Sequence, residues 1–155
     1  MTILQSSWAT GQRTTPVGDC AADVVAQLFE FALPAAALAA DDIIELGVLP
    51  ANNSPTDATL IVDKLDSGGT ATIAFDVGVM SGQVGDKVSA RTCGAELFGG
   101  SNVGQAGGTV RASLASAFTL APSDVDRSIG VRIKAAAAAQ VAGAKVRLLL
   151  TYRAV

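Results

Sequence analysis

Acid–base or metal chemistry in this chain would have to begin with its carboxylates, because the 155 residues contain no histidine. This absence excludes Ser-His-Asp and Cys-His nucleophile sites, and it excludes zinc or haem held by imidazole. Cys20 and Cys93 are too few for a four-thiolate metal site. The sequence leaves open whether these two thiols pair.

The carboxylates fall into two kinds of candidate site. An acid–base pair needs two carboxyl groups in different environments. The candidates for such a pair are Asp57, Asp63, Asp66 and Asp76. The candidate calcium ligands are Asp41, Asp42 and Glu45, or Asp124 and Asp126. None has the spacing of a known calcium loop, and aspartate beside strands is typical of turns and solvated faces. We therefore predict no enzyme, no metal and no cofactor.

A glycine-rich stretch at residues 103–108 has neither the dinucleotide fingerprint nor the Lys-Ser/Thr of a phosphate-binding loop. Glycines here are explained equally well by a tight loop or by a loop that docks on another protein. In the second case Gln105 and the loop backbone make the contact, and Arg111 donates to a partner carboxylate.

Charge is distributed unevenly along the chain. Residues 1–78 carry ten acids and two bases (−8), residues 79–155 carry four acids and nine bases (+5), and the net charge is −3. If both halves interleave in one sheet system, their electric fields cancel, and this is the interpretation that we favour. Otherwise the charge asymmetry indicates a polyanionic binding partner or self-association of the chain. A pI near 4.7 and the lack of aromatic residues between the basic ones argue against a nucleic acid as binding partner.

Alternating residues in two segments near the C-terminus predict a basic strand face. Its members are Arg132, Lys134, Lys145, Arg147 and Arg153. This face is either a docking surface for an acidic protein or a plain solvated surface.

The first 22 residues are small and polar, and Pro16 and Gly18 argue against regular structure. We predict an extended N-terminal arm. Trp8 on this arm either anchors on a neighbouring protein or covers the domain's own core. Arg13 joins it among the expected partner contacts.

Residues 23–155 are predicted to form one domain. The expected strands are residues 24–33, 43–49, 58–65, 71–80, 88–92, 109–120, 128–134 and 145–153. We also expect a helical turn at 35–40, a turn at 51–56 and a long loop at 94–108. This pattern predicts an all-β fold, an antiparallel β-sandwich of jelly-roll type with about eight strands.

Alanine supplies 29 residues, and alanine buries little area. We therefore predict a thin core that depends on neighbouring molecules for stability. The chain lacks a signal peptide and a membrane span, which predicts a soluble protein made in a reducing cytosol.

Several segments together resemble a known family. They are DIIELGVLP at 42–50, DATLIVD at 57–63, FDVGVMSG at 75–82, VGQAGG at 103–108, DRSIGVR at 126–132 and LLLTY at 148–152. Over roughly residues 40–153 the chain is similar to small structural proteins of tailed bacteriophages, in particular head decoration or cement proteins.

The resemblance implies a non-enzymatic β-rich module that binds the outside of the phage head and stabilises contacts between major capsid subunits. It implies assembly in the host cytoplasm, self-association as a trimer by preference or a dimer, and no membrane partner. The alternative is a carbohydrate- or receptor-binding module of a virion, and a third hypothesis is a hydrolase that uses an aspartate pair.

Overall fold

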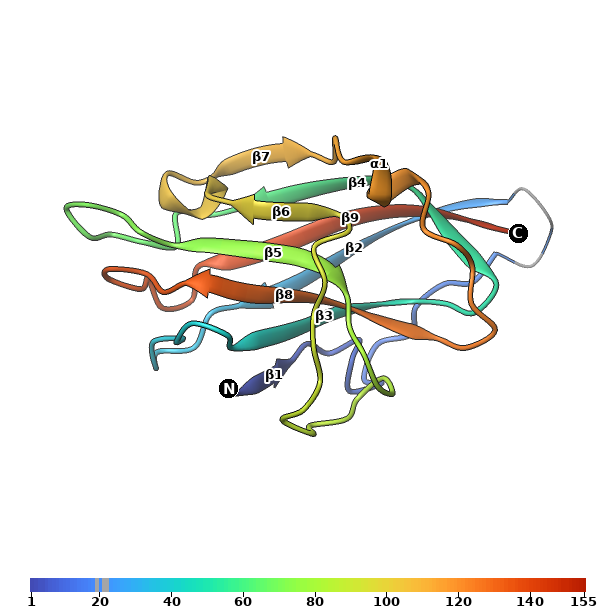
Figure 1. The fold of residues 1–155 in the computed structure, drawn as a ribbon, viewed down its shortest axis with the longest axis horizontal. Helices are drawn as coiled ribbons and strands as arrows, with labels where there is room; N and C mark the ends of the chain where they lie inside the picture. Colours follow the sequence, from blue (N-terminus) through green and yellow to red (C-terminus); the bar gives the residue numbers. More distant parts are fainter. Residues whose placement is uncertain (19, 21–22) are drawn as a thin grey trace.

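The computed structural model describes residues 1–18, 20 and 23–155, which form two β-sheets packed face to face (Figure 1). The first sheet has the order β1 (Ile3–Gln5), β3 (Ile43–Leu49), β8 (Arg127–Ala135), β5 (Ala74–Val79) and β6 (Phe98–Ser101). The second has the order β2 (Val24–Ala32), β9 (Lys145–Ala154), β4 (Asn53–Val62) and β7 (Gly108–Arg111). A 3-10 turn (Val103–Gln105) and the short helix α1 (Ala115–Phe118) complete the described elements. The predicted all-β sandwich is confirmed.

Strand β1 pairs with β3 in parallel, and every other pairing is antiparallel. Without β1, each sheet has four strands, in the orders β2-β9-β4-β7 and β3-β8-β5-β6. Early and late strands of the chain therefore lie in both sheets. These orders are compatible with the jelly-roll expectation, which stays a prediction.

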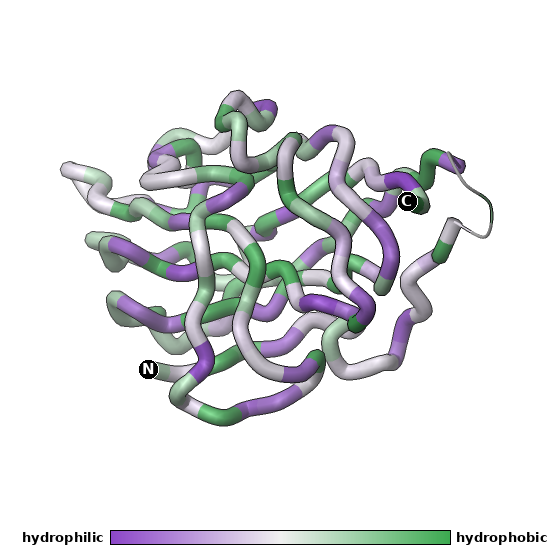
Figure 2. Tube along the Cα trace, turned by 45° about the vertical axis from the view of Figure 1, so that its right-hand side comes forward, coloured by the Kyte–Doolittle hydropathy of each residue, from purple (hydrophilic) through white to green (hydrophobic). Residues whose placement is uncertain are grey.

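Alternation of side chains along the strands builds the core between the sheets. Figure 2 shows hydrophobic and hydrophilic residues alternating along many strands. On β9, Val146, Leu148, Leu150 and Tyr152 are buried, while Arg153 points outward. The sheets approach closely at Gly47, where an added Cβ would lie 2.5 Å from the Phe29 ring.

The core is made of large side chains, which corrects the prediction of a thin alanine-based core. Its fully buried members include Phe29, Phe75, Leu60, Ile129 and Tyr152. Among the described residues only Ala9, Ala58, Ala112, Ala117 and Ala144 are buried alanines. The alanine-rich stretches 35–40 and 135–139 lie mainly in loops instead.

The N-terminal segment is docked on the domain over much of its length. Ser6 N–H donates to the Glu45 carbonyl at 3.0 Å, and the Tyr152 hydroxyl donates to the Pro16 carbonyl. Trp8 is 7% exposed and meets the Phe29 ring edge-on with centroids 5.5 Å apart. Trp8 therefore covers the protein's own core, which is the second of the two alternatives that the sequence left open, and a contact of Trp8 with a neighbouring protein stays a prediction.

Several element boundaries also differ from the sequence prediction. Strand β4 begins at Asn53 and therefore includes residues 53–56 of the predicted turn. A register shift between Pro55 and Asp57 accommodates the proline within the strand. The predicted strand 109–120 divides into β7 and α1, and the predicted strand 88–92 and helical turn 35–40 are not formed. Strand β6 lies within the predicted loop 94–108. No helix in the described part of the chain is long and apolar enough to cross a membrane.

Candidate contact surfaces

Among the described residues Asp66 is the most buried aspartate, and the hydrogen bonds that it accepts there all come from backbone N–H groups. Its donors are the N–H groups of Gly68 at 2.9 Å, Thr72 at 2.8 Å, Ile73 at 3.3 Å, Ala138 at 2.8 Å and Ala139 at 2.9 Å. Burial alone would raise the pKa of Asp66, but the backbone donors outweigh it and hold that pKa far below its usual range. This carboxylate joins the loop before β5 to the loop between β8 and β9.

The other three candidate acids form ion pairs with arginines. Their shortest contacts are Asp57–Arg111 at 2.9 Å, Asp63–Arg147 at 3.0 Å and Asp76–Arg132 at 2.5 Å. For Asp57 and Asp63 the arginine hydrogen bond is the main cause of a lowered pKa. For Asp76 burial opposes the lowering, and Arg132 with the Gly100 N–H outweighs it. These groups act as ion pairs and hydrogen-bond acceptors, without the raised pKa that a general acid requires.

The candidate calcium ligands do not converge. Asp42 accepts hydrogen bonds from the backbone N–H groups of Thr2 at 2.5 Å and Ala39 at 2.9 Å. Asp126 accepts one from Ala51 N–H at 2.8 Å. Within the described ranges no group of three or more His, Cys, Asp or Glu is placed to hold a metal ion.

An ion pair that the sequence interpretation missed lies under the connection from Met80 to Leu97. Glu45 and Arg91 are 3.1 Å apart, with side chains 0% and 3% exposed. Glu45 also accepts from Ser128 Oγ at 2.5 Å, Gln5 Nε2 at 2.9 Å and Gly85 N–H at 3.0 Å. Burial would raise the pKa of Glu45, but these hydrogen bonds, led by that from Arg91, lower it. The sequence feature that points to this ion pair is the single acid, Glu45, in the apolar run IIELGVL, since a buried charge needs a partner.

The predicted basic face does not exist as one surface. Arg132 and Lys134 lie on β8 in one sheet, whereas Lys145, Arg147 and Arg153 lie on β9 in the other. Outward side chains on the two sheets point to opposite sides of the sandwich.

Most of these cations are also neutralised. Glu30 accepts from both Lys145 and Arg147 at 2.8 Å, and Arg132 pairs with Asp76. The acidic first half and the basic second half therefore interleave, as the favoured interpretation predicted. Lys134 and Arg153 are exposed and form no ion pair with a described residue.

Two residues singled out near the glycine-rich stretch differ in availability. Gln105 donates from Nε2 to the Ile73 carbonyl at 3.1 Å, so its amide is already engaged. Arg111 lies at the end of edge strand β7, and its side chain remains 72% exposed beside Asp57. Of the two, Arg111 is the one open to a partner.

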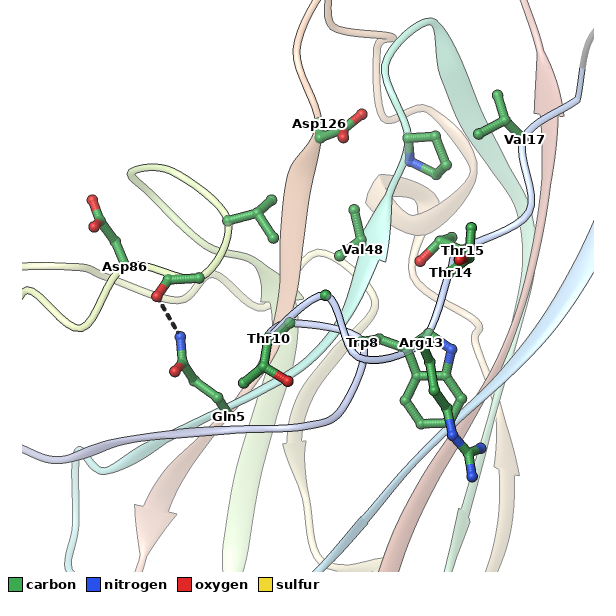
Figure 3. A pocket seen from close by; sticks show the side chains of 15 residues that line it. Gln5, Trp8, Thr10, Arg13, Thr14, Thr15, Val17, Val48, Asp86 and Asp126 are labelled. Carbon is green, nitrogen blue, oxygen red and sulfur yellow. Dashed lines mark hydrogen bonds between the residues drawn. The ribbon is translucent and has the colours of Figure 1, made fainter.

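An open groove of about 780 Å³ runs beside the N-terminal segment (Figure 3). Its lining includes Gln5, Trp8, Thr14, Val48 and Asp126. The Arg13 guanidinium carbon lies 4.8 Å from the centroid of the Trp8 ring, which is a cation–π contact. This groove offers a mixed polar and apolar contact surface.

The two thiols are chemically separate. Cys20 is exposed, Cys93 is buried, and both are free. Burial raises the pKa of the Cys93 thiol to about 12, so this thiol is unreactive at neutral pH.

Comparison with known proteins places this geometry in context. No protein-family model and no curated protein sequence matches the chain. A chain in the capsid of Ralstonia phage GP4 is 53% identical, with 97% of each chain covered and a TM-score of 0.93. The fold is also similar to that of a chain in the cyanophage Pam1 capsid, at 21% identity with 91% of each chain covered and a TM-score of 0.68.

A third similar fold occurs in the capsid of the Helicobacter pylori bacteriophage KHP30, at 13% identity and a TM-score of 0.56. That alignment covers 86% of this chain and 90% of the KHP30 chain. Likeness at such identity supports the fold alone, whereas the GP4 chain is close enough in sequence to be a family member. The chain therefore belongs to a family of phage capsid proteins, which are structural proteins of the virion.

Proposed function

We propose that the protein is a non-enzymatic decoration protein that binds the outside of a tailed-phage head and stabilises contacts between major capsid subunits. The observation that carries this proposal is the 53% identity, over 97% of the chain, to a chain of the GP4 capsid. The buried carboxylates also support the proposal. Asp66, Glu45 and Asp76 hold loops and strands together instead of lining a reactive cavity.

Charged contact with the capsid is the docking mode that we propose. Four cations of the predicted contact set are exposed, and they lie on different parts of the molecule: Arg13, Arg111, Lys134 and Arg153. Lys134 lies near the end of β8 and Arg153 near the end of β9, at opposite ends of the fold (Figure 1). Exposed charges at the edge of a protein–protein interface mainly change the association rate and the salt dependence of binding.

The decisive observation is the position of the chain on the particle. A density map of purified virions is expected to show many copies on the outer surface, above a continuous shell formed by another protein. Density for this chain within the continuous shell would overturn the proposal and indicate a major capsid protein instead. Absence from the particle would overturn it as well.

A rebinding assay would identify the docking end. Heads that lack the protein are mixed with wild type, Lys134→Glu, Arg153→Glu or the control Lys64→Glu, and bound protein is measured after sedimentation at two salt concentrations. We expect one of the two contact variants to lose binding roughly tenfold, with a weaker salt dependence, while the control binds normally. Equal binding of all four would contradict docking through these cations.

A further inference from the structure

The groove beside the N-terminal segment contains a polar group that the fold leaves without a partner. Trp8 lines this groove and is 7% exposed. Among the described residues, none accepts a hydrogen bond from the Trp8 indole N–H, and Figure 3 shows the indole nitrogen on the side of Thr14 and Thr15. A largely buried indole N–H usually has an acceptor. The groove is where a bound molecule could supply one.

Strand β3 adds free backbone groups to the same groove. Met80 N–H donates to the Ser128 carbonyl at 2.8 Å, so Ser128 directs its backbone groups toward β5. Val48, which lines the groove, lies opposite Ser128 in the β3–β8 register. Its N–H and C=O therefore point away from β8, because antiparallel pairing alternates. Strand β1 pairs with residues 43–45, so within the described chain no strand covers this edge at Val48.

A second wall of the groove is the segment from Thr14 to Val17, which belongs to no strand. In the part of the chain that the structure describes, the backbone N–H groups of Thr14, Thr15 and Val17 donate no hydrogen bond. The segment is nevertheless attached to the domain, because the Tyr152 hydroxyl donates to the Pro16 carbonyl. Free backbone groups on a fixed segment are typical of sites that bind extended peptides by main-chain pairing.

The charges of the groove indicate what such a peptide carries. Asp86 and Asp126 line the groove, both are exposed, and neither forms an ion pair with a described residue. The cation that also lines the groove, Arg13, lies over the Trp8 ring. Two free carboxylates are complementary to a basic side chain.

Two other classes of ligand fit this groove less well. A nucleic acid would bring its phosphates against the carboxylates of Asp86 and Asp126. Trp8 leaves no open ring face on which a sugar could stack, because Arg13 covers the ring and the residue is 7% exposed. The free backbone groups and the free carboxylates together favour a peptide with a basic residue.

We propose that the groove binds an extended segment of a major capsid subunit that carries a lysine or an arginine. The backbone of this segment pairs with the free groups of Val48 and of residues 14–17, and one of its carbonyls accepts from the Trp8 indole N–H. Its cationic side chain reaches Asp86 or Asp126. The inference rests on the proposed function and adds to it the place and the chemistry of one contact with the shell.

The test uses the full-length chain and heads that lack it. Asp86→Lys and Asp126→Lys each place a cation where the bound segment carries its own, so each should weaken binding at least about tenfold. Asp124→Lys makes the same change at an exposed carboxylate that does not line the groove, so it should bind like wild type. Sedimentation measures the bound protein, and circular dichroism shows whether each variant is folded.

Cross-linking identifies the molecule that occupies the groove. The photoreactive residue p-benzoylphenylalanine replaces Thr14 at the exposed rim, and heads that carry this protein are irradiated and analysed by mass spectrometry. We expect a cross-link to one segment of the major capsid subunit that contains lysine or arginine. A cross-link to a second copy of this chain, or to a segment without a basic residue, would overturn the proposal.

This inference and the proposed function fail in different ways. If Asp86→Lys and Asp126→Lys bind heads as tightly as wild type, the groove is not the docking site, while the decoration function stands. If heads bind no wild-type protein, the decoration function is wrong, and the assignment of a capsid segment to the groove is wrong with it.

Discussion

Individual side chains with the chemistry of an active site serve here as structural bonds. Asp66 receives five backbone N–H groups, and Glu45 receives a buried guanidinium. A carboxylate accepts hydrogen bonds at both oxygens without donating any, which suits it to clusters of backbone donors. The function of these residues is therefore tested through stability and not through turnover.

Asp66→Asn is expected to lower the thermal unfolding midpoint by several degrees. The amide keeps one acceptor oxygen but places an NH₂ group against backbone donors. The measurement is the unfolding midpoint by circular dichroism at pH 7. Asp63→Asn, at an exposed ion pair, is the matched control and should unfold close to wild type. Equal midpoints for both variants would show that the backbone cluster contributes nothing.

Trp8→Ala is expected to destabilise the fold by about 3–5 kcal/mol, because it removes a large buried ring packed on Phe29. Denaturant unfolding measures this change. Arg13→Ala, which removes only the cation above the ring, should cost about 1 kcal/mol or less. Unchanged stability of Trp8→Ala, combined with loss of capsid binding, would instead indicate a free arm.

At the scale of elements, the connection from Met80 to Leu97 lies over the outer face of the five-stranded sheet. It has little regular structure, and its buried residues are Met80, Arg91, Cys93 and Leu97. Arg91 donates to the carbonyls of Ser81 at 2.7 Å and Asp86 at 2.6 Å as well as to Glu45. Arg91 thus joins two parts of this connection to each other and attaches the connection to β3.

Arg91→Met should open this connection and lower the free energy of unfolding by about 3 kcal/mol, because Glu45 is left as an unpaired buried charge. Amide hydrogen exchange is expected to increase across residues 81–92, and the pKa of Glu45 should rise in a carboxyl NMR titration. Lys87→Met changes an exposed charge on the same loop and should leave both measurements near wild type. Normal exchange in Arg91→Met would contradict the role of the ion pair.

At the scale of the whole molecule, the two oppositely charged halves of the chain fold into each other. Acids from β2, β4 and β5 meet cations from β7, β8 and β9. The pKa values of Glu30, Glu45, Asp57, Asp63, Asp66 and Asp76 are all lowered by these contacts or by backbone donors.

This arrangement predicts a pH profile. A lowered folded-state pKa contributes stability above the ordinary values of 3.8 for Asp and 4.5 for Glu, and that stability is lost as pH falls through the folded-state values. Burial raises the pKa of Cys93 and of Tyr152 to about 12, so stability is also lost as pH rises above their ordinary values of 9.0 and 10.0. Unfolding midpoints should be flat between roughly pH 5.5 and 8, because the chain has no histidine. A transition near pH 6.5 would contradict this account.

Patterns within single segments predict a strand well where the pattern reflects burial on one or both faces. The predicted strands 43–49, 128–134 and 145–153 agree almost to the residue with β3, β8 and β9, because alternating or continuous apolar runs report burial directly. Glycine-rich β6 was missed, because its strand state comes from pairing with β5 and not from its own residues.

The amino-acid sequence alone is enough to predict the class of the protein: an all-β chain without catalytic histidine chemistry, whose segments resemble phage head proteins. The assignment of each strand to a sheet requires the three-dimensional structure, since it depends on contacts between residues far apart in the chain. That structure divided the predicted basic face between two surfaces, buried Trp8 and joined Glu45 to Arg91. It also left β2 as a long open edge, because an edge exists only once the neighbouring strands have taken their places.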